Sequence, residues 1–203
     1  MKKIIFYLFI LSAFLKLNAQ YSEDCETAMD AIDEYVAFLK CIEQNSDKMC
    51  DAAQTAQLSP MSHCKEASDY LQNLIQKEDA EPMRCHLIRY LGWTGDAEYI
   101  PFLKQLLKKE ERSANEKQHI LFAFIQLGKH SDRWNYEKTF SVFEKALFSE
   151  NSDDIFTALQ GLNAIGTEPA YLLMKSQTQH EEVFIALTAQ KFCMNYEKKG
   201  GKL

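Results

Sequence analysis

The chain has few of the residues that break helices or join domains. Its 203 residues contain only seven glycines and four prolines, and these are too scattered to form a flexible linker. The polar–apolar alternation of half-buried strands is nearly absent, whereas apolar residues recur at spacings of three and four. These features exclude a large sheet and predict an all-α protein with one continuous domain over residues 20–198, followed by a short tail at 199–203.

The chain also lacks an apolar run long enough to cross a bilayer, which takes roughly 20 residues. The run from Ile4 to Leu15 follows two lysines, stops at Lys16 and precedes the small residue Ala19. This order is typical of a cleavable secretory signal over residues 1–19. No cysteine stands next to the expected cut to carry a lipid. The sequence therefore predicts an exported protein, periplasmic or extracellular, with no membrane span.

An excess of basic residues is missing as well. The formal net charge is −6, and removal of residues 1–19 takes away three lysines and no acid, which leaves −9. Nucleic acids and anionic membranes are bound through lysine and arginine. The charge balance therefore argues against both as partners and leaves basic proteins open.

The apolar spacing predicts about ten helices. We expect a long first helix at 23–43, then helices at 47–57, 64–77, 82–92, 98–109, 114–127, 135–149, 152–165, 169–177 and 180–196. Candidate N-caps, all of types that favour this position, are Ser46 or Asp47, Asp96, Ser113, Asn135 and Ser152. Glycines placed to end helices are Gly95, Gly128 and Gly166.

These three glycines are separated by 33 and 38 residues, and such a period indicates stacked repeats. The stretch LGWTGDAEYIPFL, residues 91–103, resembles the HEAT-like repeat family, whose pattern runs leucine, glycine, any two residues, glycine, aspartate, then an apolar stretch with proline and leucine. The resemblance implies a short α-solenoid of antiparallel helix pairs over residues 81–198. The long first helix and the lysine-bearing last helix would cap it with polar outer faces.

The turn inside this stretch has a physical explanation. Gly95 can adopt the left-handed conformation that ends a helix, and Asp96 can cap the donors that follow. Pro101 would clash inside one regular helix starting at Asp96, so we expect a loose turn at 96–99 and a helix from about Ile100. Residues expected in the core are Leu87, Ile88, Leu91, Phe102, Leu103, Leu106, Phe122, Phe124, Phe140, Phe143 and Phe148.

Six cysteines in an exported chain predict disulfide bonds. Cys41 and Cys50 flank the turn at 45–46 almost symmetrically, so they can face each other across a helical hairpin. Cys25 and Cys64, at the opposite end of that hairpin, form the second predicted pair. Residues 20–80 are thus expected to form a disulfide-bonded helical cap.

Cys85 is left open as a competitor for one of these bonds, and Cys193 is expected to stay a buried thiol. The dipeptides His63-Cys64 and Cys85-His86 suggest a metal site only weakly, because neighbours on a helix point about 100° apart. No metal or cofactor is predicted.

No nucleophile elbow, paired-histidine zinc helix or phosphate loop is present. His130, Ser131 and Asp132 are consecutive, and three neighbours in a turn do not converge as a triad does, so we interpret them as a linker. His119 and His180 are expected on the surface. Some HEAT-like proteins are enzymes, including DNA glycosylases and phycobilin lyases, but the first kind needs a basic groove. The sequence favours binding over catalysis.

Aromatic residues at the inter-helix turns are the candidate partner contacts, because tryptophan and tyrosine are enriched in binding hot spots. They are Trp93, Tyr99, Trp134, Tyr136 and Tyr171. The alternative, which we favour for the set, is that they pack the turns. Trp93 is the best single candidate because the family more often has a polar residue at that position.

Together these features predict an exported, non-enzymatic scaffold or adaptor that binds another protein. The alternative is an inhibitor or immunity-type protein that blocks a toxic enzyme outside the cytoplasm. A third reading, a chaperone-like or lyase activity, would require a closed apolar pocket between helix pairs.

Overall fold

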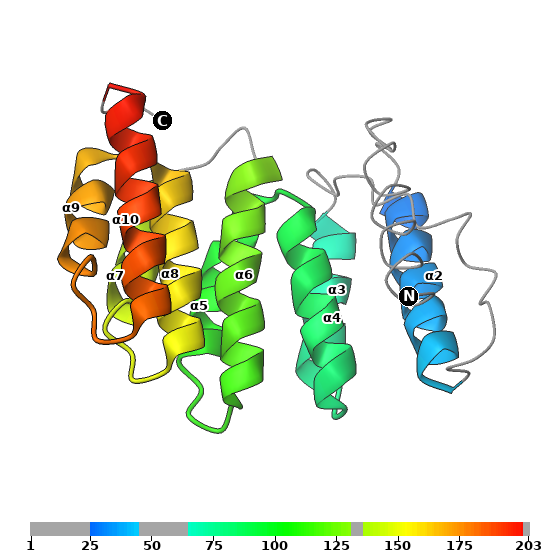
Figure 1. Cartoon of the computed structure of the whole chain (residues 1–203). Coiled ribbons are helices and arrows are strands. Elements are labelled where there is room, and N and C mark those ends of the chain that lie inside the picture. The colour runs from blue at the N-terminus through cyan, green and yellow to red at the C-terminus, as the bar shows by residue number, and fades with distance from the viewer. Residues whose placement is uncertain (1–24, 45–64, 131–135, 201–203) are drawn as a thin grey trace, which may run out of the picture. The chain divides into compact units, whose positions relative to one another are not determined.

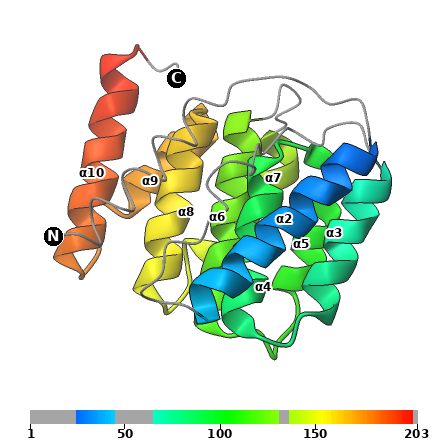
Figure 2. The ribbon, with the colours of Figure 1, turned by 90° about the vertical axis from the view of Figure 1, so that its right-hand side faces the viewer.

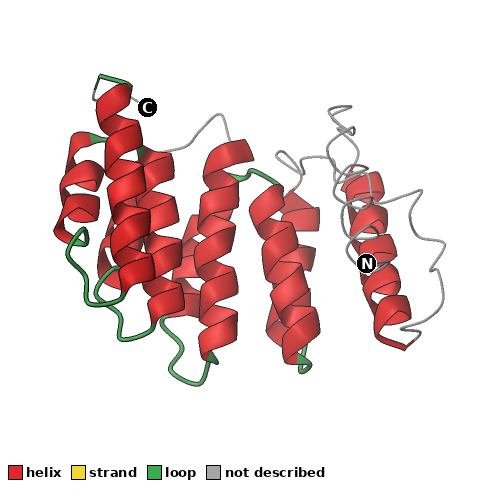
Figure 3. Cartoon of the chain, viewed as in Figure 1, coloured by secondary structure: helices red, strands yellow, loops and turns green. Residues whose placement is uncertain are grey.

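The computed structural model describes residues 25–44, 65–130 and 136–200. These ranges contain nine α-helices, one short 3-10 helix and no strand, so the all-α prediction is confirmed. Figure 3 shows helices joined by loops throughout the described part of the chain. None of these helices is long and apolar enough to span a bilayer. The chain divides into two compact units, residues 1–83 and 84–203.

The first unit contains a packed pair of helices, α2 (Cys25–Gln44) and α3 (Lys65–Lys77). The buried residues Ile32, Tyr35 and Leu39 lie three or four positions apart, which places them on one face of α2. Leu71 and Ile75 are the fully buried counterparts on α3. The helix expected at 47–57 lies outside the described residues.

The second unit is built from seven helices, the first of which begins just before the unit boundary. They are α4 (Glu81–Trp93), α5 (Ile100–Leu107), α6 (Ala114–His130), α7 (Tyr136–Ala146), α8 (Ser152–Ile165), α9 (Glu168–Ser176) and α10 (Val183–Lys198). From α5 onward each helix packs on the next in sequence, and α5 with α7, α6 with α8 and α8 with α10 pack as well. In Figure 1 α6, α8 and α10 stand side by side in front of α5 and α7, and Figure 2 shows α6 beside α8 from another side.

The turn between α4 and α5 has the predicted form. Gly95 is left-handed, with φ 71°, and the side chain of Asp96 accepts a hydrogen bond of 2.9 Å from the backbone N–H of Glu98. A 3-10 helix, η2 (Ala97–Tyr99), follows, and α5 starts at Ile100 with Pro101 in its first turn. The predictions for residues 95–101 are confirmed because local backbone chemistry decides this segment.

Two further glycines permit close helix contacts. A Cβ atom on Gly92 of α4 would lie 2.7 Å from the Cα atom of Ala123 in α6, and one on Gly161 of α8 would lie 2.3 Å from the Phe143 ring of α7. Both distances are shorter than van der Waals contact. The first glycine of the LGWTG segment is therefore a packing residue, and the second is a helix terminator.

Two predicted helix boundaries are wrong. Gly128 does not end a helix but lies inside α6, which continues to His130. The N-cap of α8 is Asn151 rather than Ser152, and its side chain accepts hydrogen bonds from the backbone N–H groups of Asp153 and Asp154. Asn and Ser are both favoured at the N-cap position, so the sequence alone did not show whether Asn151 or Ser152 caps the helix.

Several apolar residues are more exposed than predicted. Phe148 is 66% exposed because it lies in the turn after α7, where the adjacent Leu147 takes the buried position. The last helix, α10, was expected to present a polar outer face, but it exposes Val183, Phe184, Leu187 and Met194. Its lysines, Lys191 and Lys198, lie in the second half of the helix, whereas Val183, Phe184 and Leu187 lie in the first half.

A buried ion cluster joins α4 to the start of α6. Glu116 is only 1% exposed, and its carboxylate accepts bonds from both Arg84 and Arg112. The Arg84 Nε to Glu116 Oε1 distance is 2.8 Å, and the Arg84 Nη2 to Glu116 Oε2 distance is 3.1 Å. This two-pronged geometry is the strong form of an arginine–carboxylate contact.

Glu116→Ala should lower the free energy of unfolding by about 3–5 kcal/mol, because it leaves two largely buried guanidinium groups without their anion. Urea unfolding of the variant and of the exposed control Glu110→Ala measures the difference. A loss for Glu116→Ala no larger than that of the control would show that the cluster does not stabilise the fold.

Gly161→Ala should be destabilising by about 1–3 kcal/mol despite the better helix propensity of alanine, because the added methyl group overlaps the Phe143 ring. Phe143→Leu removes that ring edge, so the double variant should lose less than the sum of the two single losses. Thermal unfolding of the four proteins completes the cycle. Strict additivity would contradict the close contact.

Candidate functional site

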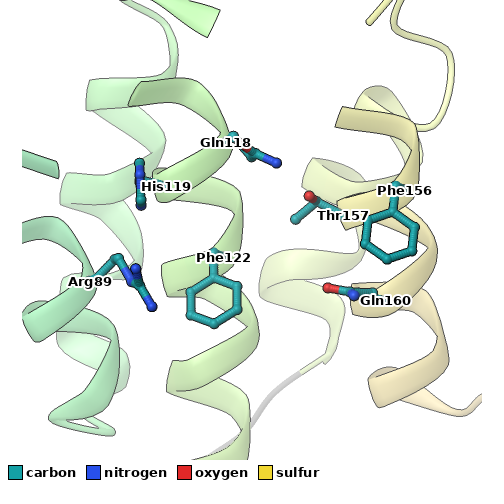
Figure 4. A pocket seen from close by; sticks show the side chains of 7 residues that line it. All are labelled: Arg89, Gln118, His119, Phe122, Phe156, Thr157 and Gln160. Atoms are coloured by element: carbon teal, nitrogen blue, oxygen red, sulfur yellow. The ribbon is translucent and has the colours of Figure 1, made fainter. Parts of the chain in front are cut away.

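The second unit contains a surface cavity of about 310 Å³. Side chains from three helices line it: one from α4, three from α6 and three from α8 (Figure 4). We call this cavity the α4–α6–α8 pocket, and its lining residues are Arg89, Gln118, His119, Phe122, Phe156, Thr157 and Gln160.

Helical spacing brings these side chains together. Gln118 and Phe122 are one turn apart on α6, and Phe156 and Gln160 are one turn apart on α8, so each pair shares a face. In Figure 4 Gln118 points toward α8, while Gln160 points back toward Phe122. The Phe156 ring also contacts Phe184 of α10, with ring centroids 5.0 Å apart. The pocket therefore has two aromatic and two amide side chains along its walls.

Arg89 supplies the permanent charge of the pocket. Its guanidinium carbon lies 5.2 Å from the centroid of the Phe122 ring and 5.6 Å from that of Trp93, which is within the range of cation–π attraction. The Nε atom is buried and has no hydrogen-bond partner among the described residues. Aromatic faces rather than a carboxylate thus hold this cation.

The charge of Arg89 acts on the neighbouring His86, one turn earlier on α4. Desolvation by the surrounding protein lowers the pKa of His86 below its ordinary value, and the positive charge of Arg89 lowers it further. Although the residue is exposed, its ring is therefore biased toward the neutral form at pH 7. It adds no second full charge beside the pocket.

Of the predicted aromatic contacts whose side chains the structure describes, Trp93 lies near this pocket. Trp93 is half-buried and contacts Arg89. Tyr99 has no exposed surface, so it packs the turn. Trp134 lies outside the described residues, and so does the side chain of Tyr136, the first residue of α7.

Tyr171 belongs to a separate contact between α9 and α10. Its ring stacks on Tyr196 at a centroid distance of 4.8 Å, and its hydroxyl donates a hydrogen bond of 2.6 Å to Glu197 Oε1. That hydrogen bond raises the pKa of Tyr171. Tyr171 therefore holds α9 and α10 together, in agreement with the alternative that these aromatic residues pack the structure.

None of the described cysteine side chains lines the pocket. Cys41 is disulfide-bonded, while the predicted pairings with Cys50 and of Cys25 with Cys64 involve residues outside the described ranges and stay predictions. Cys193 is a buried thiol, as expected, and burial raises its pKa. Cys85 is also a buried thiol and accepts a long contact of 3.6 Å from Asn115 Nδ2.

Within the described ranges no three His, Cys, Asp or Glu side chains converge as a metal-binding group. No protein-family model matches the chain, and no curated protein matches it.

Sequence reasoning missed most of this pocket. Phe122 was expected in the core, and His119 was assigned to the open surface; both are half-buried in the lining. The available signal was the mixture of amide and aromatic residues one turn apart, at 118 and 122 and again at 156 and 160. That mixture differs from the purely apolar face of a core helix.

Arg89→Gln should raise the pKa of His86, because it removes one of the two causes that lower it. In the wild type the His86 pKa should lie below the ordinary value of about 6.5. Because the pKa of His86 is lower in the folded state than in the unfolded state, folding favours the neutral ring. The contribution of His86 to stability is therefore present at pH 7 and is lost as the pH falls below the unfolded-state pKa and through the lower folded-state pKa. An NMR titration of the ring protons measures both pKa values.

The matched control is Lys175→Gln, which removes a cation that lies over the Tyr171 ring. It should leave the titration of His86 unchanged. A His86 pKa that does not respond to Arg89→Gln would show that the guanidinium charge does not reach it.

Proposed function

We propose that this chain is an exported, non-enzymatic protein-binding module built as a short α-solenoid of antiparallel helix pairs. In this proposal α4 with α5, α6 with α7 and α8 with α9 are the three pairs, and α10 closes the stack. The partner is another protein, held outside the cytoplasm as a scaffold or adaptor would hold it.

The contact pattern of the second unit supports the stacked arrangement. From α5 onward, helices next to each other in sequence pack together, and so do helices two apart, such as α6 with α8 and α8 with α10. A stack of helix pairs needs both kinds of contact, because each pair covers its apolar face only against its neighbours. The buried residues Leu91, Leu103 and Leu106 of the first pair fit that requirement.

The observation that carries the proposal is the α4–α6–α8 pocket. It is formed by the first helix of each successive pair, so it depends on the stacking and not on one loop. Its walls combine aromatic rings with amides and a cation, and aromatic and arginine side chains dominate the binding energy of protein interfaces. Trp93 lies next to Arg89 and extends the same surface.

A photo-crosslinking residue tests this proposal. p-Benzoylphenylalanine in place of Gln160, at the pocket, should give one discrete crosslinked product when the mature, oxidised protein is irradiated in envelope extract or culture medium. The matched control carries the same residue in place of Gln105, an exposed glutamine on α5. That control should give no product, because α5 contributes nothing to the pocket.

Equal crosslinking from both positions, or none from Gln160, would remove the pocket as the binding face. The identity of a captured protein then separates an adaptor from an inhibitor. An inhibitor gives a tight stoichiometric complex that abolishes the activity of its partner enzyme.

A further inference from the structure

Arg89 is a cation that forms no ion pair with an Asp or Glu in the part of the chain that the structure describes. The two ion pairs among the described residues both belong to Glu116, with Arg84 and Arg112. Arg89 instead lies against the Phe122 and Trp93 rings. A guanidinium that stacks on aromatic faces still presents in-plane N–H donors, whose fork matches a carboxylate.

The sign of the pocket is opposite to that of the chain. The sequence has 29 acidic and 23 basic residues, yet among the described residues no Asp or Glu lines the pocket, and the permanently charged lining residue of that set is Arg89. The remaining polar groups include the neutral side chains of Gln118 and Gln160. An acidic group entering this pocket meets attraction there, whereas the net charge of the chain repels it elsewhere.

The size of the pocket sets a second requirement. A volume of about 310 Å³ is at the lower end of small-ligand sites and is much larger than one carboxylate. The Phe122 and Phe156 rings offer apolar surface for the rest of the occupant. The geometry therefore fits a carboxylate attached to an apolar group.

We infer that the α4–α6–α8 pocket binds an acidic side chain of the partner protein together with an adjacent apolar residue. The carboxylate bonds to the guanidinium of Arg89, the apolar residue packs on Phe122 and Phe156, and Gln118 and Gln160 bond to the peptide groups between them. The inference rests on the proposed function, since it names the partner chemistry that the same site selects.

Phosphate is the competing anion for a guanidinium. It carries a charge of about −1.5 to −2, so a phosphate is usually bound by two or more cationic groups. In this pocket the one permanent cation matches the single charge of a carboxylate. Inorganic phosphate therefore serves as a competitor in the test.

The first probe is 3-phenylpropionate, a carboxylate with an apolar ring, titrated into the mature protein and followed by NMR. A probe of this size should bind with a dissociation constant on the order of 1 mM. Its neutral amide, 3-phenylpropanamide, should bind at least about tenfold more weakly, since it cannot form the charged fork. Excess inorganic phosphate should not displace the acid.

Arg89→Gln should weaken 3-phenylpropionate binding by about tenfold, and Arg89→Lys should keep part of the affinity because it keeps the charge but loses the planar fork. The matched control Lys175→Gln removes another cation that lies over an aromatic ring and should leave binding unchanged. Thermal unfolding of each variant verifies that it folds.

The inference is overturned if the acid does not bind at about 20 mM, if the amide binds equally well, if Arg89→Gln binds like the wild type, or if phosphate displaces the acid. These outcomes are independent of the crosslinking result. A protein captured at Gln160 together with a negative probe result keeps the binding module and rejects the carboxylate. Crosslinking at Gln160 that is lost in the Arg89→Gln background supports both.

Discussion

Glu116 holds α4 against the start of α6 because its carboxylate, 1% exposed, is bonded by the guanidinium groups of Arg84 and Arg112. A charge removed from water is stabilised only while its partners keep their geometry, so the two helices have little freedom to slide. Arg89 lies five residues beyond Arg84 on α4, and Phe122 lies six residues beyond Glu116 on α6. The ion cluster therefore sets the register at which Arg89 meets the Phe122 ring.

A glycine sets the separation between the same two helices. Any side chain at Gly92 would collide with the backbone of Ala123, 2.7 Å from its expected Cβ, so the close approach of α4 to α6 requires the absence of that side chain. Close approach in turn places the guanidinium of Arg89 5.2 Å from the Phe122 centroid. Polar bonding fixes position along the helices, and the small residue fixes distance between them. The site needs both.

The sequence predicted well those parts of the fold whose structure depends on the backbone preferences of a few neighbouring residues. Gly95, Asp96 and Pro101 act through their own backbone preferences, and the turn they form agrees with the prediction residue by residue. The choice between Phe122 and Phe124 is different, because the two have similar side chains and lie close together on one helix. Phe124 is fully buried and Phe122 lines a pocket, a distinction that depends on which neighbours the adjacent helices supply.

The sequence could not predict the charge of the pocket either, because that charge also depends on which neighbours the adjacent helices supply. Arg84 and Arg89 lie on one helix, and nothing in their local sequence separates them. The first is neutralised by a carboxylate from α6, and the second meets aromatic rings. Cation–π contacts at such sites are worth roughly 0.5–2 kcal/mol, which helps to hold the guanidinium in place without an acidic partner among the described residues. A cation positioned by rings is preorganised for an anion that arrives from outside, because little side-chain freedom remains to be lost on binding.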